Sequence, residues 1–451
     1  MKKLKKILKI ILIMIPGLLG FYGFMQIEDL SISWGIYHSL KLYSFSTPDI
    51  DLNIYIEIAR WLAPLATAGI LVIVFQSLQT GLRKILVAKR KDSCSVYGDG
   101  QDARNLLKDL GNTGIAGSDK ILNTKYHVLL FDNEQEGLAF YNEHKKELGK
   151  GKVYLELDRI PARSIQKNGI VAFSMAENCA ATYWIDHPTV SKTEKIAIIG
   201  NGVMPDALLT KALLLNIVDV NQKLEYHIWN DNNDYSDLHT QLTNIMMDSI
   251  SFHQNESGRY VDLLNTMDRI ILCSTDEENI CRAGEFLEYT SKPDIYIRVR
   301  NAANISVIFN NDRIIPYGQS QRLATKNIII NEALLDRAKK IHQNYVTLYG
   351  GDTWENLEEF KKRSNISSAE YHIVLRRLFD QGVEVEKLAE LEHIRWCRFH
   401  ILNNWQYGPE VDKIKRTHNL LIDYINLDEN QKQKDREVVE IALNREINST
   451  L

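Results

Sequence analysis

Two apolar stretches near the N-terminus constrain the fold of this chain more strongly than any other feature. The second stretch, residues 61–82, contains no charged residue and has the roughly 20 residues that a helix needs to cross the hydrocarbon core of a bilayer. The first, residues 4–25, is uncharged from 10 onward, and its preceding lysines can extend to the membrane surface. We therefore expect two transmembrane helices. A cleaved signal peptide is the alternative for the first stretch, because it also has a basic start and an apolar core.

The charges around these stretches predict how the chain lies in the membrane. Basic residues precede the first stretch at 2–6 and follow the second at 83–91, whereas acidic residues dominate 28–57. Cytoplasmic segments carry the excess of lysine and arginine. We therefore expect a multi-pass protein of the cell (inner) membrane, with lipid as a partner and both ends in the cytoplasm. Residues 33–45 form either an interfacial helix or a pore-lining segment, and they lack the TVGYG pattern of a potassium filter.

Length, charge and cysteine usage limit what the rest of the chain can be. The 451 residues suffice for a membrane module and two or three soluble domains. A formal net charge of −4 gives no support for nucleic-acid binding, so no nucleic-acid partner is expected. The five cysteines form no CxxC pair and are typical of reduced cytosolic thiols, not of a disulfide framework or a zinc site. We expect no metal site.

A glycine turn of the kind that binds nucleotides follows the basic segment. An apolar run leads into Gly98, Gly100 and Ala103, and a helical pattern begins at once. In this order the backbone can approach a pyrophosphate at a helix N-terminus. The acidic residue expected about 20 residues later has no convincing strand to carry it, and Asp119 is poorly placed. Residues 92–190 are therefore interpreted as an abbreviated Rossmann-like unit.

A second glycine turn has better surroundings. The buried run KIAIIGNG, from Lys195, ends in Gly200 and Gly202, a helix follows, and the next strand ends in Asp231. Strands and helices then alternate, which predicts a parallel sheet with helices on both faces. The turn either binds a nucleotide or dinucleotide, whose identity the sequence leaves unknown, or is only a structural turn.

These two units resemble the RCK (regulator of potassium conductance) or TrkA-N domains, which are attached to two-helix membrane units. The resemblance covers roughly residues 92–340 and concerns the layout more than the motifs. It implies binding of nucleotides or ions, assembly into a homo-oligomeric ring, with a tetramer expected, and a pull on the inner membrane helix. The segment 81–91 is the implied mechanical link.

The C-terminal part has a different character. From residue 336 onward, apolar residues recur at steps of three and four, as in amphipathic helices. The run LAELEHIRWCRFHILNNWQYG concentrates aromatic and basic residues. It resembles the ryanodine-receptor (RyR) repeat domain over about 337–439. The matching residues are Leu391-Glu392-His393, Arg395-Trp396, Trp405-x-Tyr407-Gly408, Asp412, Lys415, His418 and Lys434-Asp435-Arg436, with Ile341-His342, Asn344-Tyr345 and Trp354 before them.

The residue types in this run suit a small aromatic anion such as a nucleotide. Aromatic faces stack on bases, guanidinium and ammonium groups bind phosphate or carboxylate, and histidine can donate at cytosolic pH. Two structural alternatives stay open: the tryptophans belong to a helical core, and Glu392 with Arg395 forms an i,i+3 pair. The candidate ligand-binding residues are His393, Arg395, Trp396, Trp405, Tyr407, Lys415, Arg416 and His418.

Together these features predict an α/β protein with a two-helix transmembrane module at 1–91, tandem Rossmann-like units at 92–190 and 191–336, and a mainly helical RyR domain at 337–451. The sequence has no GxSxG, HExxH or Walker motif, so no catalytic residue is assigned and an enzyme is not expected. The favoured function is an oligomeric membrane protein, an ion channel or membrane effector, gated by a nucleotide-like ligand. The alternatives are a membrane-anchored sensor or scaffold without conduction and a tethered NAD-dependent enzyme.

Overall fold

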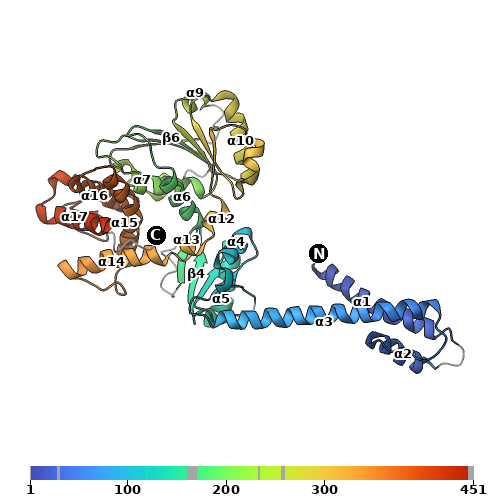
Figure 1. Ribbon diagram of the computed structural model, residues 1–451. Coiled ribbons are helices and arrows are strands. Elements are labelled where there is room, and N and C mark those ends of the chain that lie inside the picture. Colours follow the sequence, from blue (N-terminus) through green and yellow to red (C-terminus); the bar gives the residue numbers. More distant parts are fainter. Residues whose placement is uncertain are drawn as a thin grey trace. The chain divides into compact units, whose positions relative to one another are not determined.

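The computed structural model describes residues 2–27, 31–118, 120–159, 170–231, 234–254 and 260–444 (Figure 1). Asp119 and two of the acidic residues used to predict the orientation, Glu28 and Asp29, lie outside these residues. The chain divides into two compact units, Met1–Lys89 and Arg90–Leu451. The boundaries expected at 190/191 and 336/337 stay predictions.

The N-terminal unit is a small helical assembly. It consists of α1 (Lys2–Phe24), α2 (Ile32–Lys41), the 3₁₀ turn η1 (Leu42–Ser44) and α3 (Ile54–Ala88). α1 packs against α3 and α2. Glycine permits this close approach: a Cβ added at Gly20 would lie 2.6 Å from Leu42 Cδ1, and one added at Gly23 would lie 2.7 Å from Ile56 Cγ1. The Tyr43 hydroxyl, in η1, donates to Ile13 O of α1 at 2.6 Å and so joins η1 to α1.

The prediction of two transmembrane helices is met only in part. Among the described residues, one helical segment, Ile54–Val72, is long and apolar enough to cross a membrane; Ile13–Phe24 is a shorter apolar segment. At about 1.5 Å per residue the shorter segment covers roughly 18 Å of a hydrocarbon core about 30 Å thick. The predicted second span, 61–82, overlaps the longer segment, and the predicted first span is not confirmed.

The first sheet has five parallel strands in the order β2-β1-β3-β4-β5. A strand thus follows the glycine turn: the sequence reading overlooked β2 because it has three residues and begins with glycine. This order is one of the two common arrangements of doubly wound α/β sheets. The elements are β1 (Cys94–Tyr97), α4 (Gln101–Leu110), η2 (Gly111–Thr113), β2 (Gly114–Ala116), β3 (Tyr126–Leu129), α5 (Glu134–Leu148), β4 (Lys152–Glu156), β5 (Ile170–Phe173) and α6 (Met175–Asp186).

The second sheet has six parallel strands in the order β11-β10-β9-β6-β7-β8, which is the strand order of the Rossmann fold. The predicted parallel α/β architecture is therefore confirmed. The elements are β6 (Lys195–Gly200), α7 (Met204–Leu215), β7 (Glu225–Asn230), α8 (Tyr235–Leu238), η5 (Leu242–Asn244), β8 (Ser249–His253), α9 (Val261–Leu264), β9 (Arg269–Leu272), α10 (Asp276–Tyr289), β10 (Asp294–Arg298), η7 (Ala302–Asn304), α11 (Ile305–Ile308) and β11 (Ile314–Tyr317).

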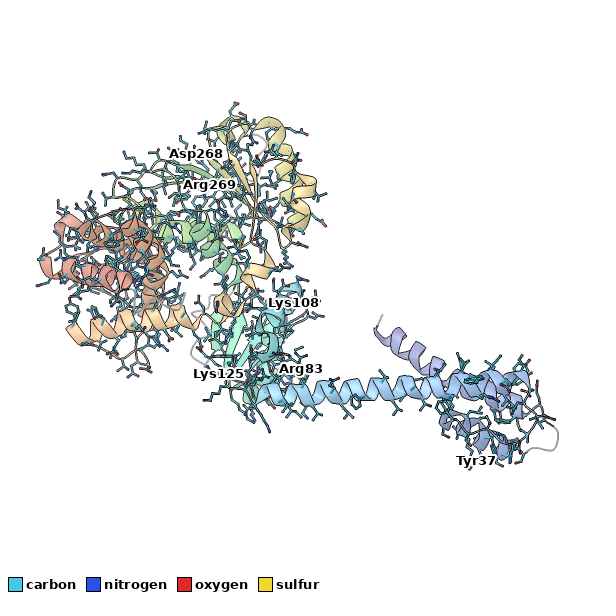
Figure 2. The ribbon with its side chains drawn as sticks, in the orientation of Figure 1. Tyr37, Arg83, Lys108, Lys125, Asp268 and Arg269 are labelled. Atoms are coloured by element: carbon cyan, nitrogen blue, oxygen red, sulfur yellow. The ribbon has the colours of Figure 1, made fainter. Side chains whose placement is uncertain are left out.

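A buried arginine ties the segment between the two sheets to the second sheet. Arg269, at the start of β9 (Figure 2), forms an ion pair with Glu194, and both side chains are almost fully buried. Its guanidinium also donates to His187 O at 2.8 Å and to Pro188 O at 3.1 Å. The guanidinium thereby binds two carbonyls of the segment that connects the two sheets.

Four long helices form the C-terminal region, as the sequence predicted. Two short helices lead into them, and a pair of two-residue strands lies between the last two. The elements are α12 (Ser320–Leu323), α13 (Lys326–Ile329), α14 (Glu332–Tyr349), α15 (Glu359–Asp380), α16 (Val385–Leu402), β12 (Gln406–Tyr407), β13 (Thr417–His418), η8 (Tyr424–Asn426) and α17 (Glu429–Leu443).

The C-terminal helices and the second sheet share one hydrophobic core, in which α7 contacts both α15 and α16. A buried ion pair lies in this contact. Arg398 on α16 is 0% exposed, and its guanidinium lies 2.7 Å from Asp248, which precedes β8. The same guanidinium donates to Leu213 O at 3.2 Å and to Met246 O. Asp248 accepts a further bond from Leu224 N at 3.0 Å, so both charges are paired and hydrogen-bonded.

A second ion pair lies in the same contact. Lys211 on α7 donates to both carboxylate oxygens of Glu370 on α15, at 2.9 and 2.8 Å. Lys211 is 8% exposed, and Glu370 is partly buried. Glu370 on α15 and Arg398 on α16 therefore each form an ion pair with a residue that belongs to the region of the second sheet.

Breaking the Arg398–Asp248 pair should destabilise the protein severely. We expect Arg398→Met to lower the free energy of unfolding by about 3–5 kcal/mol, because it leaves a buried carboxylate unpaired. The double variant Arg398→Met/Asp248→Leu should recover most of this loss. Urea denaturation of the full chain in detergent measures both. Lys292→Met, at the exposed pair with Asp268, should cost less than about 1 kcal/mol. Equal losses in the single and double variants would contradict the charge argument.

Candidate functional site

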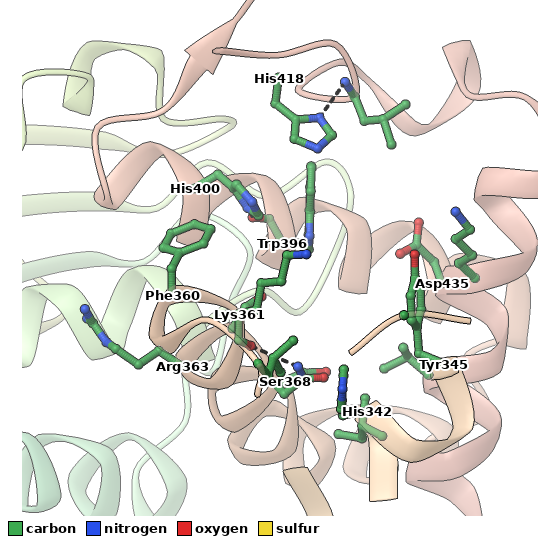
Figure 3. Close-up of a pocket in the computed structure, with 18 of the residues that line it drawn as sticks. His342, Tyr345, Phe360, Lys361, Arg363, Ser368, Trp396, His400, His418 and Asp435 are labelled. Atoms are coloured by element: carbon green, nitrogen blue, oxygen red, sulfur yellow. Dashed lines mark hydrogen bonds between the residues drawn. The ribbon is translucent and has the colours of Figure 1, made fainter. Parts of the chain in front are cut away.

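A cavity of about 950 Å³ lies within the C-terminal region (Figure 3). Its wall is built by α14, by the N-terminal half of α15, by α16 and the segment after it, and by α17. A second hollow among the described residues, lined by Cys179, Tyr183 and Tyr317 among others, measures only about 10 Å³. The candidate site is built around this cavity.

One side of the cavity is aromatic. Phe360 in the first turn of α15 stacks on Trp405, with ring centroids 5.5 Å apart and planes inclined by 25°. Trp396 and His400 lie one turn apart on α16, which brings their centroids to 3.9 Å. The His418 ring meets Trp396 edge-on at 5.0 Å. Trp396, Trp405 and His418 are only partly buried, so a flat ligand can reach them.

Two histidines of the aromatic side are neutral near pH 7. His400 donates from Nδ1 to Trp396 O at 2.9 Å, and burial lowers its pKa to about 3. His418 accepts a bond at Nδ1 from Leu420 N at 3.1 Å, and burial lowers its pKa as well. The neutral His418 ring therefore carries its proton on Nε2, which is a hydrogen-bond donor.

His393, unlike His400 and His418, is positively charged near pH 7. Its Nε2 contacts Ile422 O at 2.9 Å and its Nδ1 lies 3.3 Å from Asp435. A carbonyl and a carboxylate only accept, so both ring nitrogens must carry a proton. Burial favours the neutral ring, but the hydrogen bonds to Asp435 and Cys397 outweigh it and raise the pKa of His393 to about 10. His393 is therefore a cation whose charge is already paired.

Arg395 also lines the cavity, with its guanidinium already bound. Its Nε and Nη2 each lie 2.8 Å from a carboxylate oxygen of Glu392, and its Nη1 donates to Ser367 Oγ at 3.2 Å. Ser368 donates to the same carboxylate at 2.9 Å. Arg395 is 1% exposed. This is the i,i+3 pair that the sequence left open, and all three guanidinium nitrogens are engaged.

Exposed basic residues lie where the cavity opens. Arg416 lies on its rim, with φ at +54°, and donates one bond to Asn403 O at 3.0 Å. Lys413 forms an ion pair with Glu358 at the start of α15. Lys361, in the first turn of α15, also faces the cavity. These groups place positive charge beside the aromatic side.

The structure brings together six of the eight candidate residues. His393, Arg395, Trp396, Trp405, Arg416 and His418 line the cavity. Tyr407 and Lys415 do not belong to its described lining: Tyr407 is 62% exposed, and Lys415 pairs with Asp412 at 3.6 Å.

The sequence reading missed the contribution of α14, α15 and α17. Tyr345, Phe360, Lys361 and Lys434 all line the cavity. Two of them, Tyr345 and Lys434, belong to the residues that resemble the RyR domain, but the sequence provided no reason to assign them to a ligand. The residues of α15 carried a usable signal, because Lys361, Ser364, Asn365 and Ser368 recur at helical spacing and form one polar face.

The first glycine turn is explained by packing. Gly98 has φ of +117°, and an added Cβ would lie 1.9 Å from Leu130 O. A Cβ at Gly100 would lie 2.4 Å from Asp132 Oδ1, and Ala103 is buried in the core. These contacts require small residues whether or not a ligand binds.

Carboxylates surround this first turn. Glu156, at the end of β4, is partly buried, and its burial together with Asp158, Asp102, Glu134 and Asp132 raises its pKa to about 8. The carboxyl edge of a parallel sheet is where a pyrophosphate would bind. Negative charge concentrated at this edge repels the phosphates of a dinucleotide, so the structure gives no support to dinucleotide binding at this turn.

The second turn has the strand geometry that the sequence predicted. Gly200 is paired with Asn230, so Asp231 directly follows at the same edge of the sheet. A Cβ at Gly200 would lie 2.5 Å from Cys273 Sγ, and Gly202 has φ of +78°. Asn230 donates to Asp206 at 3.1 Å and to Gly202 O at 3.3 Å.

An acid occupies the start of the helix after this turn. Asp206 lies in the first turn of α7, which bears no side-chain cap. Burial raises the pKa of Asp206 to about 6. A carboxylate at this position takes the favourable place at the helix N-terminus that a phosphate would otherwise occupy.

Comparison with known proteins identifies one part of the chain. Residues 370–445 match the family model of the RyR domain. This match extends from α15 to the end of α17 and supports the predicted C-terminal RyR domain. No curated protein and no solved structure matches the chain.

Glu156 should make the stability of the protein depend on pH. Its pKa rises from 4.5 in the unfolded chain to about 8 in the folded one. The contribution of Glu156 to stability is therefore fully present below pH 4.5 and is lost as the pH rises through 8. Glu156→Gln should melt at the same temperature as the natural chain at pH 4.5 and at least about 3 °C higher at pH 8.5. Thermal denaturation at the two values measures this. Glu143→Gln, at an exposed position of α5, is the matched control. A constant difference at both values would refute the assignment.

Arg395 should be needed for folding more than for ligand contact. Because Arg395→Ala leaves the buried Glu392 unpaired, we expect a loss of about 3–5 kcal/mol in the free energy of unfolding. Lys415→Ala, which removes an exposed charge of the same domain, should change it by less than about 1 kcal/mol. Urea titration followed by tryptophan fluorescence compares the two. An Arg395→Ala variant as stable as Lys415→Ala would show that the pair has no structural role.

Proposed function

We propose that this chain is an oligomeric membrane protein whose RyR domain binds a nucleotide-type small anion and thereby controls the N-terminal unit. The observation that carries the proposal is the cavity of about 950 Å³ with aromatic rings on one side and exposed basic residues beside them. This volume lies within the range of small-molecule sites, roughly 300–1,000 Å³.

The lining matches the two parts of a nucleotide. Partly exposed Trp396 and Trp405 offer flat faces for a base, and such stacking contributes about 1–3 kcal/mol per base. Lys361 and Arg416 supply charge for a phosphate. His418 Nε2 adds a neutral donor. His393 and Arg395 are paired with carboxylates in the wall of the cavity, where these pairs fix the position of α16.

Several features support control of a membrane by this domain. α3 continues to Ala88, so most of the expected link at 81–91 is a single stiff helix. Leu65, Phe75 and Leu82 on α3 are each more than 60% exposed, which suits contact with lipid or with another copy. Two parallel sheets follow one another in the chain, and the second has the strand order of the Rossmann fold, which is the layout expected of the RCK resemblance. Because two helices per chain cannot enclose a pore, conduction requires a homo-oligomer, for which we propose a tetramer at the inner membrane.

One observation favours a second function, that of a membrane-anchored sensor without conduction. Among the described residues a single helical segment, Ile54–Val72, is long enough to span a bilayer, and a single span suffices for an anchor. A tethered NAD-dependent enzyme has less support, since acids lie at both glycine turns. We propose no catalytic role.

Nucleotide binding is tested by calorimetry on the full chain in detergent. We expect binding by at least one of AMP, GMP and their di- and triphosphates. Trp405→Ala should weaken it about 5- to 150-fold through loss of stacking. Tyr407→Ala removes an exposed ring of the same segment that lies outside the cavity, and it should leave affinity unchanged. Absence of binding by every nucleotide would exclude the proposal, and equal effects of the two variants would place the ligand elsewhere.

Conduction is tested separately from binding. With the full chain in liposomes, addition of the nucleotide that binds should start ion flux, and Trp405→Ala should shift the half-maximal concentration upward by the factor found in calorimetry. Binding without flux, in a protein that stays monomeric in detergent, would favour the anchored sensor.

A further inference from the structure

We propose that the cavity of the RyR domain takes a dinucleotide, a ligand with two ring systems joined through phosphate. This inference rests on the proposed function and specifies the ligand class of the same site. It follows from a second ring-binding surface on the far side of the cavity, from a polar face between the two surfaces, and from the different charge of the two ends.

The second ring-binding surface is Tyr345 on α14. Its ring is 44% exposed and lines the cavity, and Lys434 of α17 lies 5.7 Å from its centroid. Tyr349, one turn further on, lies 5.1 Å away and supports the ring from behind. Figure 3 shows Phe360 and His400 on one side of the cavity and Tyr345 with Asp435 on the other. A single base stacked on Trp405 therefore leaves Tyr345 uncovered.

A polar face of α15 connects the two ends. Lys361, Ser364, Asn365 and Ser368 follow one another along α15 and all line the cavity. Lys361 stands in the first turn, near the aromatic side, and Ser368 lies two turns deeper. These ammonium, hydroxyl and amide groups suit a phosphate linker with its sugars, which have charge and hydroxyls but no flat ring.

The start of α15 favours the anionic part of the ligand. No side chain caps this helix, and its N-terminus is the positive end of the helix dipole. Glu358, just before it, is bonded to Lys413, and this bond lowers the pKa of Glu358 and compensates its charge. Lys361 adds a positive charge at the same place.

The tyrosine end has a different chemistry. Its acids are already bound: Asp435 pairs with the cationic His393, and Glu437 accepts a bond from the Tyr349 hydroxyl at 2.9 Å. With the cations His393 and Lys434 beside them, these carboxylates leave the end without an excess of charge for a phosphate, and their oxygens can accept hydrogen bonds from amino groups. This end therefore fits a base with exocyclic amino groups and no charge. The phosphates belong beside α15, and the second base belongs on Tyr345.

The test compares one base with two. Calorimetry on the full chain in detergent uses AMP and GMP against the linear dinucleotides pApA and pGpG. We expect the better dinucleotide to bind about 5- to 150-fold more tightly than its mononucleotide, as one added stacked base provides. Tyr345→Ala should abolish this gain and leave mononucleotide affinity unchanged. Trp405→Ala should weaken both ligands, and Tyr345→Phe should behave as the natural chain.

The outcomes separate the two proposals. Mononucleotide binding without any gain for the dinucleotide overturns the present inference and leaves the proposed function standing. The same holds if Tyr345→Ala weakens both ligands equally while the melting temperature is unchanged. Failure of all four nucleotides to bind overturns the inference, and if the nucleoside di- and triphosphates also fail to bind, the proposed function is overturned with it.

Discussion

The buried contact between Arg398 and Asp248 determines where α16 lies, and the cavity depends on α16. One side of this helix is held against the second sheet by Arg398, and another side presents His393, Trp396 and His400 to the cavity. A helix buried on both sides cannot rotate without exposing one of these sets. The helix that forms one wall of the cavity is therefore part of the same packed core as the Rossmann-type sheet.

The elements with strong local patterns could be predicted from the sequence. The alternation of buried strands and helices gave the parallel sheets, and helical periodicity with the RyR pattern gave the C-terminal domain. β2 was missed because three residues beginning with glycine carry no strand signal. Six of eight candidate residues do line one cavity, since three of them share α16 and the other three lie in the segment that directly follows it. Tyr345 and Phe360 were not assigned, because their places in the cavity wall depend on how α14 and α15 pack, which periodicity does not specify.

The two glycine turns show why a motif alone did not identify a site. At Gly98 and Gly100 the absent side chains make room for Leu130 and Asp132, so glycine is required by the protein's own packing. The carboxylates that surround Glu156, and Asp206 at the second turn, then place negative charge where a phosphate would bind. The spacing of the glycines indicates the backbone geometry of the turn. It does not indicate the charge of the side chains that other elements place at the same edge of the sheet.

The two acceptors of His393 have a consequence for the charge of the cavity. With a pKa of about 10 at His393 and about 3 at His400, neither ring changes charge when the pH moves moderately below or above 7. The electrostatic field that these two positions set inside the cavity is therefore constant over that range. If the proposed ligand binds here, neither of these two rings makes its affinity depend on pH.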